Sequence, residues 1–217
     1  MSNTPVIDES LTRWSHPAGD RAGKPLLVLL HGYGADEHDL FGLRDHLPTE
    51  YVVAAVAAPL SPPWPAPGRS WYAIDREAPR DERGSAGITL AGHALLAWLD
   101  DAGAEASSVT LLGFSQGAAV SLQALRLAPE RFAAVVALSG YAAHGALPGD
   151  AALRESRPPV FWGRGGADEV IAAHLIDHTA QWLPDHTTLS GRVYPGLAHA
   201  ISAEELVDIR AFLDKSA

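Results

Sequence analysis

Residues 110–130, TLLGFSQGAAVSLQALRLAPE, decide the fold of this chain. The stretch opens with apolar and small residues that are typical of a buried strand, and its second half has the composition of a helix. Ser115 stands at the junction, with Gly113 before it and Gly117 after it. A strand that turns directly into a helix is the repeating unit of α/β proteins. The junction raises the question of whether Ser115 is a reactive nucleophile or an ordinary turn residue.

Apolar runs that end at glycine or proline predict buried strands elsewhere in the chain as well. With the opening strand included, they cover residues 26–30, 51–59, 107–113, 131–140, 157–166 and, in a shorter form, 191–196. Apolar residues with helical spacing lie between and after them, in residues 90–99, 118–127, 171–182 and 203–215. Because buried strands alternate with helices, we expect a three-layer α/β sandwich with a mostly parallel central sheet.

Length and composition limit the class of protein. The chain has 217 residues, which favours a single domain over residues 1–217, or at most two small ones. A net charge of −10 opposes binding to nucleic acid and to anionic lipid. The absence of cysteine excludes disulfides, thiolate metal ligands and a cysteine nucleophile, and it fits a cytoplasmic protein. We expect no signal peptide and no stable membrane insertion, because the start is polar and no apolar run reaches roughly 20 residues.

The five residues GFSQG, 113–117, match the pattern G-x-S-x-G. Between a buried strand and a helix this pattern predicts a nucleophile elbow, a sharp turn that holds the serine Oγ clear of the sheet edge. Side chains two residues to either side would collide with the turn, which accounts for the glycines. The N–H groups at the start of the following helix are suited to binding an oxyanion. We therefore predict that Ser115 is a nucleophile.

A serine hydroxyl needs a base to accept its proton, and the expected order along the chain is serine, acid, histidine. We choose His199, because it lies between the last short strand and the last helix and so reaches the same edge as Ser115. His174 and His178 lie one helical turn apart, but no third ligand completes a metal site, so we interpret them as surface residues. Two further histidines lie in polar loops after Ser115, namely His144 and His186.

The acid is expected in a loop between the serine and the histidine. Asp168 follows a buried strand and a glycine turn in VFWGRGGADEV, residues 160–170. Its neighbour Glu169 is a rival, and Asp168 also suits the simpler role of a helix N-cap. We choose Asp168 as the acid.

The first apolar strand supplies the remaining part of the site. In LLHGYGADEHDL, residues 29–40, a glycine-bounded turn follows the strand. An oxyanion hole needs two backbone N–H groups aimed at one point, and we assign them to Tyr33 and Gln116. His31 is a rival base on paper, but from its position we interpret it as a hydrogen-bonding prop for the turn.

Residues 58–87 form a long stretch without periodicity that is rich in proline and contains three large aromatic residues, Trp64, Trp71 and Tyr72. A loop of this length inside a compact domain is usually functional or disordered. We predict that these aromatics form the wall of a substrate pocket. The alternative is a surface loop that closes a small core of its own.

Four of these stretches together resemble the bacterial carboxylesterase, lysophospholipase and acyl-protein thioesterase family of the α/β hydrolases. They are LLHGYGAD (29–36), LLGFSQGAAVSLQAL (111–125), GRGGADEVI (163–171) and YPGLAHAIS (194–202), and SWYAI (70–74) resembles a further loop. The resemblance implies a compact α/β hydrolase with no lid domain and no cofactor. It also implies Ser115, Asp168 and His199 as the catalytic triad, with oxyanion donors at Tyr33 and Gln116.

The chain departs from this family pattern at four positions near the site. Arg164 stands where the family often has histidine, and Glu169 where it often has proline. Ala198 and Ala200 flank the histidine where glycine and serine are frequent. None of these departures removes a catalytic group, so they concern the acyl-chain preference and the geometry of the acid loop.

We predict a serine esterase that cleaves small carboxylic esters of short or medium acyl chain through an acyl-enzyme intermediate. Lysophospholipids and acyl-protein thioesters are close alternatives as substrates. A catalytically silent α/β hydrolase that binds a small ligand as a receptor is the alternative of another class. We expect no metal, no cofactor and no nucleic-acid partner, and the sequence leaves the formation of a homodimer open.

Overall fold

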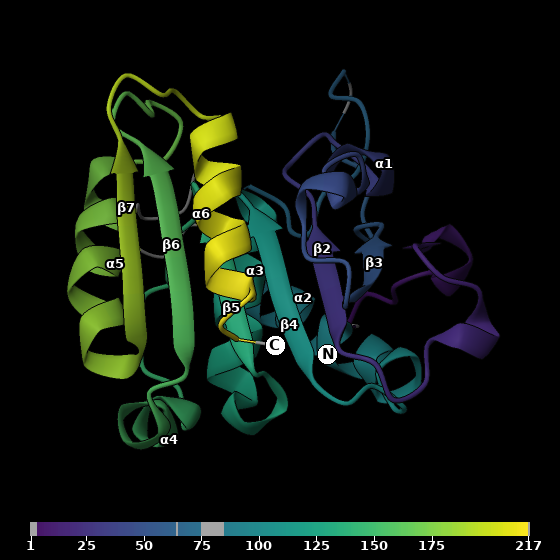
Figure 1. Ribbon diagram of the computed structural model, residues 1–217. Helices are drawn as coiled ribbons and strands as arrows, with labels where there is room; N and C mark the ends of the chain where they lie inside the picture. The colour runs from purple at the N-terminus through teal and green to yellow at the C-terminus, as the bar shows by residue number, and fades with distance from the viewer. Residues whose placement is uncertain (1–3, 64, 75–84, 217) are drawn as a thin grey trace.

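A seven-stranded sheet lies at the centre of the molecule, with the strand order β1-β3-β2-β4-β5-β6-β7 (Figure 1). The computed structural model describes residues 4–63, 65–74 and 85–216. β1 pairs with β3 in antiparallel fashion, and all other neighbours are parallel. The strands are β1 (Arg13–Trp14), β2 (Leu26–Leu30), β3 (Val52–Val56), β4 (Val109–Phe114), β5 (Ala134–Leu138), β6 (Pro159–Gly165) and β7 (Thr188–Tyr194).

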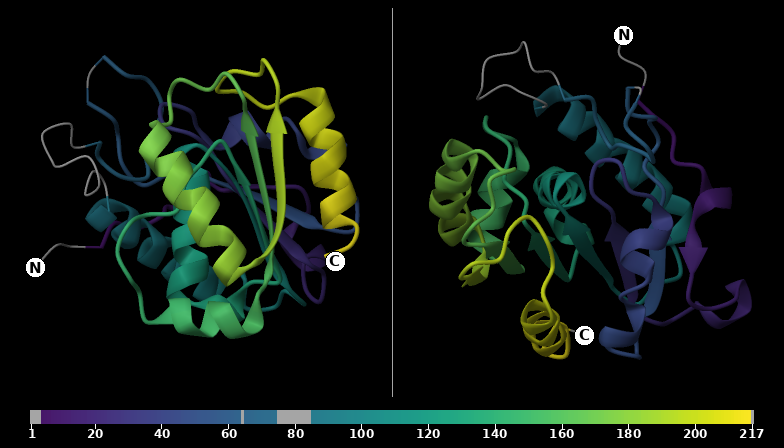
Figure 2. Two further views of the ribbon diagram at one scale, coloured as in Figure 1. Left: turned by 90° about the vertical axis from the view of Figure 1, so that its left-hand side faces the viewer. Right: turned by 90° about the horizontal axis from the view of Figure 1, so that it is seen from above.

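Helices cover both faces of this sheet, as the view from above in Figure 2 shows. One face carries α1 (Glu37–Phe41) and α6 (Ala203–Leu213). The other carries α2 (Ser85–Ala102), α3 (Gln116–Leu127) and α5 (Ala173–His186), while α4 (Gly149–Ser156) lies near the lower end of β6. Short 3₁₀ turns occupy Glu9–Leu11, Ala18–Asp20, Arg44–His46 and Pro129–Arg131. The three-layer α/β sandwich with a mostly parallel sheet is therefore confirmed.

The all-apolar strands are explained by burial on both faces. Every residue of β2, β3 and β5 is buried. Side chains alternate along a strand, so Val28 and Leu30 pack on the side of α2 and α3, while Leu27 and Leu29 pack on the side of α1 and α6. A strand whose two faces both pack into a hydrophobic core has no exposed position for a polar residue, so it appears in the sequence as a continuous apolar run.

The last strand differs from its predicted form. We expected a short strand within 191–196, whereas β7 spans Thr188–Tyr194 and pairs with the whole of β6. Most of its side chains are exposed or half-buried, because β7 forms the edge of the sheet. An edge strand needs no continuous apolar run. Because β7 contains polar residues, its first half could not be recognised from apolar runs in the sequence.

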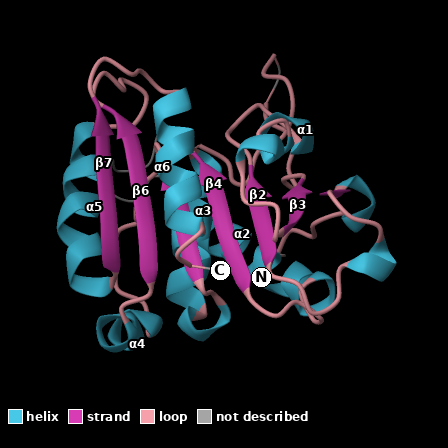
Figure 3. Cartoon of the chain, viewed as in Figure 1, coloured by secondary structure: helices cyan, strands magenta, loops and turns pink. Residues whose placement is uncertain are grey.

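None of the helices within the described residues is long and apolar enough to cross a membrane. The described parts of the chain also include no separate domain over the carboxyl edge of the sheet, the edge to which the arrowheads of β4, β6 and β7 point in Figure 3. The loops that leave this edge are those in which the sequence placed the site.

At this edge the start of α3 lies directly against the sheet. A Cβ added to Gly117 would overlap the carbonyl oxygen of Leu30 in β2, and a Cβ added to Gly113 would overlap the carbonyl oxygen of Gly117. Backbone therefore packs on backbone, with no room for a side chain between them. This close approach is the structural requirement behind the two glycines of GFSQG.

We predict that Gly117→Ala lowers the free energy of unfolding by at least about 3 kcal/mol, because overpacking against rigid backbone cannot be relieved by a side-chain rotation. Gly191→Ala is the matched control, since among the described residues its added Cβ would meet only carbons of the Leu189 side chain, at an ordinary contact distance of 3.8 Å. Thermal and urea unfolding of both variants test this expectation. Equal stability of the two variants would contradict the packing argument.

Candidate active site

Ser115 occupies the turn between β4 and α3 in a backbone conformation that is rare outside glycine. Its φ is 55° and its ψ is −115°. Such a conformation costs on the order of 1–3 kcal/mol and persists only where surrounding contacts impose it. The N–H of Ser115 donates to the carbonyl of Leu138 at 2.8 Å, and its carbonyl accepts from the N–H of Ala119 at 3.1 Å. These bonds fix the turn, and Ser115 lines a cavity at the edge of the sheet.

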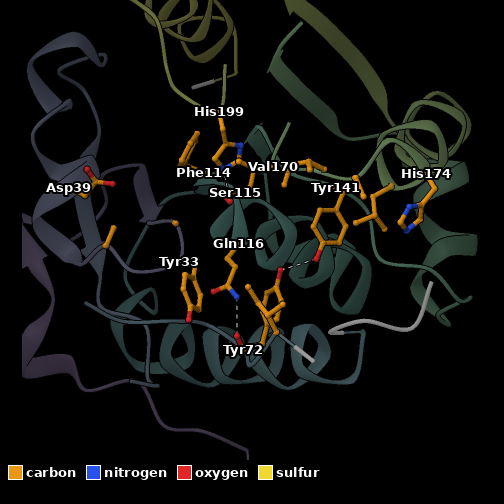
Figure 4. A pocket seen from close by; sticks show the side chains of 16 residues that line it. Tyr33, Asp39, Tyr72, Phe114, Ser115, Gln116, Tyr141, Val170, His174 and His199 are labelled. Atoms are coloured by element: carbon orange, nitrogen blue, oxygen red, sulfur yellow. Dashed lines mark hydrogen bonds between the residues drawn. The ribbon is translucent and has the colours of Figure 1, made fainter. Parts of the chain in front are cut away.

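A continuous chain of hydrogen bonds joins the three side chains that the sequence predicts as catalytic, two of which, Ser115 and His199, are labelled in Figure 4. Nε2 of His199 lies 2.9 Å from Oγ of Ser115, and Nδ1 of His199 lies 2.7 Å from Oδ2 of Asp168. Because a carboxylate only accepts hydrogen bonds, Nδ1 donates to Asp168, which leaves Nε2 as the acceptor for the serine hydroxyl. The phenyl ring of Phe114 packs against the imidazole, with ring centroids 4.9 Å apart.

The helix N-cap role that the sequence left open does not apply to Asp168, because α5 begins at Ala173 with Ala172 as its N-cap. The carboxyl group of Asp168 instead bonds to the loop before α5 and to His199. Its Oδ1 accepts from the N–H groups of Val170 and Ile171, at 2.9 and 3.3 Å, while Oδ2 binds His199. Burial would raise the pKa of Asp168, but the hydrogen bonds from His199 and from these two N–H groups outweigh it and hold the pKa below its usual value. The rival Glu169 is exposed. An ionised, oriented carboxylate is what a histidine base requires.

The two backbone N–H groups that we assigned to an oxyanion hole belong to residues that line the same cavity as Ser115, namely Tyr33 and Gln116. Within the described part of the chain, neither N–H donates to another residue. The side chain of Gln116 faces the other way and is buried. Its Oε1 accepts from the N–H of Trp71 at 3.0 Å, and its Nε2 donates to the carbonyl of Tyr72 at 2.9 Å. Gln116 therefore connects the start of α3 to residues 71–72.

His31 makes hydrogen bonds that support the turn after β2, as its position in the sequence indicated. The N–H of Ala58 donates to Nε2 of His31 at 3.1 Å, so Nδ1 carries the proton and donates to the carbonyl of Gly32 at 2.7 Å. Burial lowers the pKa of His31, which keeps the ring neutral and able to accept. His31 thereby holds the turn that presents the N–H of Tyr33.

A cavity of about 670 Å³ opens above Ser115. Figure 4 shows Tyr33 on one side of the serine and Tyr141, Val170 and His174 on the other. Its lining is mostly apolar, apart from the catalytic groups, a few hydroxyls, Asp39 and His174. The sequence analysis missed Tyr141, which lies three residues after the end of β5, and three apolar residues in the segment from β6 into the first turn of α5, Val170, Ile171 and Leu175. Their position after the carboxyl ends of parallel strands was the available signal.

The predicted aromatic wall needs correction. Tyr72 lines the cavity, but Trp71 does not, because its side chain is fully buried in the core. Its indole N–H donates to the carbonyl of His31 at 2.8 Å, so Trp71 supports the turn that follows β2. Trp64 lies outside the described residues. Neither interpretation from the sequence fits Trp71, because its side chain packs in the main core on the α2 and α3 side of the sheet and not in a small core of the loop's own.

The histidines that we interpreted as surface residues are also placed differently. His178 is half-buried and stacks on His144, with ring centroids 3.9 Å apart, and His174 lines the cavity. Among the described residues, one group of three acidic or histidine side chains is close enough to hold a metal ion: Asp36, Glu37 and His38. Asp36 already caps α1 by accepting from the N–H of His38 at 2.9 Å, and helix capping accounts for this group.

Comparisons with known proteins agree on one family. The family model described as phospholipase/carboxylesterase matches residues 17–217. Acyl-protein thioesterase 1 of Neurospora crassa is 30% identical over 207 residues, which cover 86% of this chain and 84% of that protein. Acyl-protein thioesterase 1 of Debaryomyces hansenii is 34% identical over 119 residues, and the match spans about half of each protein, 54% and 51%. The crystal structure of esterase PE8 shares 29% identity and superposes with a TM-score of 0.77, covering 99% of this chain and 100% of that one.

Glu205 is a buried carboxyl beside the site that the sequence analysis did not single out. It lies in the first turn of α6, shortly after His199, and is 1% exposed. Neither of its carboxyl oxygens has a hydrogen-bond partner among the described residues. The carboxyl packs on β6 at Gly163, where an added Cβ would overlap Oε1. Burial raises the pKa of Glu205 to about 7; the nearby backbone N–H of Ser202 opposes this rise in part, and the charge of Asp208 adds to it.

This raised pKa predicts a pH-dependent stability. The folded state keeps the Glu205 proton where the unfolded chain has lost it, so the contribution is fully present below the ordinary pKa of about 4.5 and is lost as the pH rises through about 7. Glu205→Gln should therefore gain stability relative to wild type at pH 8, by about 3 kcal/mol, and little at pH 4.5.

The exposed neighbour on the same helical turn provides the matched control, Glu204→Gln. Unfolding free energies of wild type and both variants from pH 4.5 to 8 measure the effect. A wild-type profile that runs parallel to that of Glu205→Gln over this range would show that Glu205 does not titrate there.

Proposed function

The chain belongs to the phospholipase/carboxylesterase family, and from this we propose that it is a serine hydrolase that cleaves carboxylic esters. The observation that carries the proposal is the unbroken hydrogen-bond chain from Asp168 through His199 to Ser115 at the floor of the cavity. Each of the three residues follows the carboxyl end of a different strand. A nucleophile, a base and an orienting acid in mutual contact at a cavity are the parts that acyl transfer needs.

The reaction follows from this geometry in two halves. As Oγ of Ser115 forms a bond to the ester carbonyl carbon, Nε2 of His199 takes the hydroxyl proton and the carbonyl oxygen becomes negative. The intermediate then collapses, the carbon–oxygen bond to the alcohol breaks, and His199 gives its proton to the departing oxygen. Water repeats the sequence in place of the serine, which releases the acid and restores Ser115. Asp168 stabilises the positive imidazole in both halves without taking up a proton.

The developing negative oxygen needs donors that are already in place. We assign this role to the backbone N–H groups of Tyr33 and Gln116, because both residues border the cavity beside Ser115 and neither N–H donates to another residue in the described ranges. Donors that are fixed before the reaction cost no reorganisation during it. Two rigid features hold them here: the His31 prop for Tyr33 and the first turn of α3 for Gln116.

For the substrate we propose small carboxylic esters with short or medium acyl chains. The support is a mostly apolar cavity of about 670 Å³, which is within the range of small-molecule sites. Thioesters are the second candidate, favoured by the relatives that are named acyl-protein thioesterase. Hydrolysis rates over a series of straight acyl chains, each as an oxygen ester and as a thioester, distinguish the two and locate the preferred length.

Replacing the nucleophile should abolish turnover without unfolding the protein. We expect Ser115→Ala to lower kcat/KM for the best ester by roughly three or more orders of magnitude and to abolish labelling by a fluorophosphonate probe. Ser121→Ala, in the helix that follows Ser115, is the matched control and should keep both, because among the described residues the Ser121 hydroxyl bonds only to the carbonyl of Gly117, one turn back. Labelling that persists in folded Ser115→Ala would refute the assignment. A labelled wild type that hydrolyses no ester or thioester would favour a receptor.

The acid is tested by a neighbouring pair. Asp168→Asn should keep the fold and lower kcat strongly, by up to about four orders of magnitude, because an amide N–H in place of the carboxylate favours the wrong tautomer of His199. Glu169→Gln should be nearly silent, since that side chain is exposed. Single-turnover rates for both variants provide the measurement. The opposite pattern, a silent Asp168→Asn and an impaired Glu169→Gln, would transfer the role to Glu169.

A further inference from the structure

Two phenol hydroxyls meet in the wall of the cavity. Oη of Tyr72 lies 3.0 Å from Oη of Tyr141, and both side chains line the cavity that contains Ser115. Figure 4 shows the two rings pointing toward one another across the cavity wall. They come from distant parts of the chain, residues 71–74 before α2 and the loop after β5. The mechanism proposed above uses neither hydroxyl.

Both tyrosines are held from behind by other hydrogen bonds. The carbonyl of Tyr72 accepts from Nε2 of Gln116 at 2.9 Å. On the other side, the residue before Tyr141 is fixed by the indole N–H of Trp162, which donates to the carbonyl of Gly140 at 3.1 Å. The residue after it is fixed by its own N–H, which donates to Oγ1 of Thr179 at 2.9 Å. The two hydroxyls are therefore presented by anchored backbone on both sides, so little freedom is lost when a ligand binds them.

Counting protons shows that the pair is not saturated. Two hydroxyls have two hydrogens, and one hydrogen bond between them uses only one. No other described residue accepts from either hydroxyl. Burial raises the pKa of both phenols, most strongly that of Tyr72, so both keep their protons at neutral pH. Within the part of the chain that the structure describes, one O–H donor of this pair is therefore left over, and both residues border the cavity.

The surroundings of this donor are apolar. The cavity is also bordered by Ile74, Val170, Ile171 and Leu175. A hydrocarbon chain that fills this space displaces water and leaves the spare O–H without an acceptor, which is costly for a buried donor. A chain with an oxygen atom at the right position supplies the acceptor and keeps the apolar contacts. A site built to form a hydrogen bond discriminates more sharply than an apolar wall does.

We propose that the Tyr72–Tyr141 pair is a specificity-determining donor for an acceptor oxygen in the substrate chain. The preferred substrates are then esters whose acyl or alcohol part has an ether, hydroxyl or carbonyl oxygen along its length, rather than all-carbon esters of equal length. This inference rests on the proposed ester hydrolase function and specifies the substrate class for the same site.

The test compares matched esters on matched variants. In one series an oxygen replaces each methylene in turn from the third carbon of the acyl chain of p-nitrophenyl hexanoate, so that every member remains a carboxylic ester. In the other, 2-methoxyethyl esters are compared with butyl esters, which places the oxygen in the alcohol. For each pair the kcat/KM ratio of the oxygen ester to the carbon ester is measured in wild type and in the double variant Tyr72→Phe/Tyr141→Phe. Dividing one ratio by the other cancels the intrinsic reactivity of the esters.

We expect the wild-type ratio to exceed that of the double variant by about tenfold for at least one oxygen position, equivalent to about 1.4 kcal/mol. The series in which this occurs identifies the acyl or the alcohol part as the group on this wall. Each single variant, Tyr72→Phe or Tyr141→Phe, retains one hydroxyl and should keep part of the preference, which also secures the test if the double variant folds poorly. Tyr51→Phe, in the core on the other face of the sheet, should match wild type.

Equal ratios in wild type and double variant at every oxygen position, with Ser115 still labelled by a fluorophosphonate, would overturn this inference and leave the proposed function intact. If neither ester of any pair is hydrolysed and Ser115 is not labelled, the proposed function fails, and this inference fails with it.

Discussion

The approach of α3 to the sheet is the constraint on which the site depends. Because Gly117 lies against the carbonyl of Leu30, the helix begins at the carboxyl edge with no side chain in between. The chain can pass from β4 into a helix placed there only through a sharp turn, and Ser115 takes the strained conformation that this turn requires. The same turn brings the N–H of Gln116 beside the serine. The proposed nucleophile and the proposed oxyanion donor thus both depend on one backbone contact.

The parts of the site that follow directly from the fold were predictable from the sequence. All-apolar strands mark the sheet, and the carboxyl end of each strand marks a place at its edge, so Ser115, Asp168 and His199 could be placed together before any coordinates. What failed was the interpretation of large side chains within a loop. Trp71 is as apolar as a pocket residue should be, yet its indole is buried and bonded to the carbonyl of His31. Composition alone cannot distinguish a residue that lines a pocket from a buried residue that supports the pocket from behind.

Two further features were out of reach because they depend on a partner distant in the chain. Glu205 has a sequence spacing from Ser202 that is typical of a helix capping box, but its carboxyl packs on Gly163 instead. Nothing in the sequence near Glu205 shows that β6 offers a glycine at that point. The contact of Tyr72 with Tyr141 likewise joins residues that are 69 positions apart. Local patterns indicate which groups are present, while tertiary packing decides which of them meet.

The side chain of Gln116 has a consequence for how an enzyme of this design can diversify. A single residue borders the reacting serine with its backbone and fixes Trp71 and Tyr72 with its amide. If Ser115 is the nucleophile, substitutions of Gln116 should therefore change both substrate choice and reaction rate. This residue holds Tyr72 in the cavity lining and also follows Ser115 directly in the chain. Divergence toward new substrates is easier in the segment between β6 and α5, where the exposed Val170 borders the cavity. Residues between β6 and α5 can thus change more freely during evolution than the part of the cavity lining that Gln116 anchors.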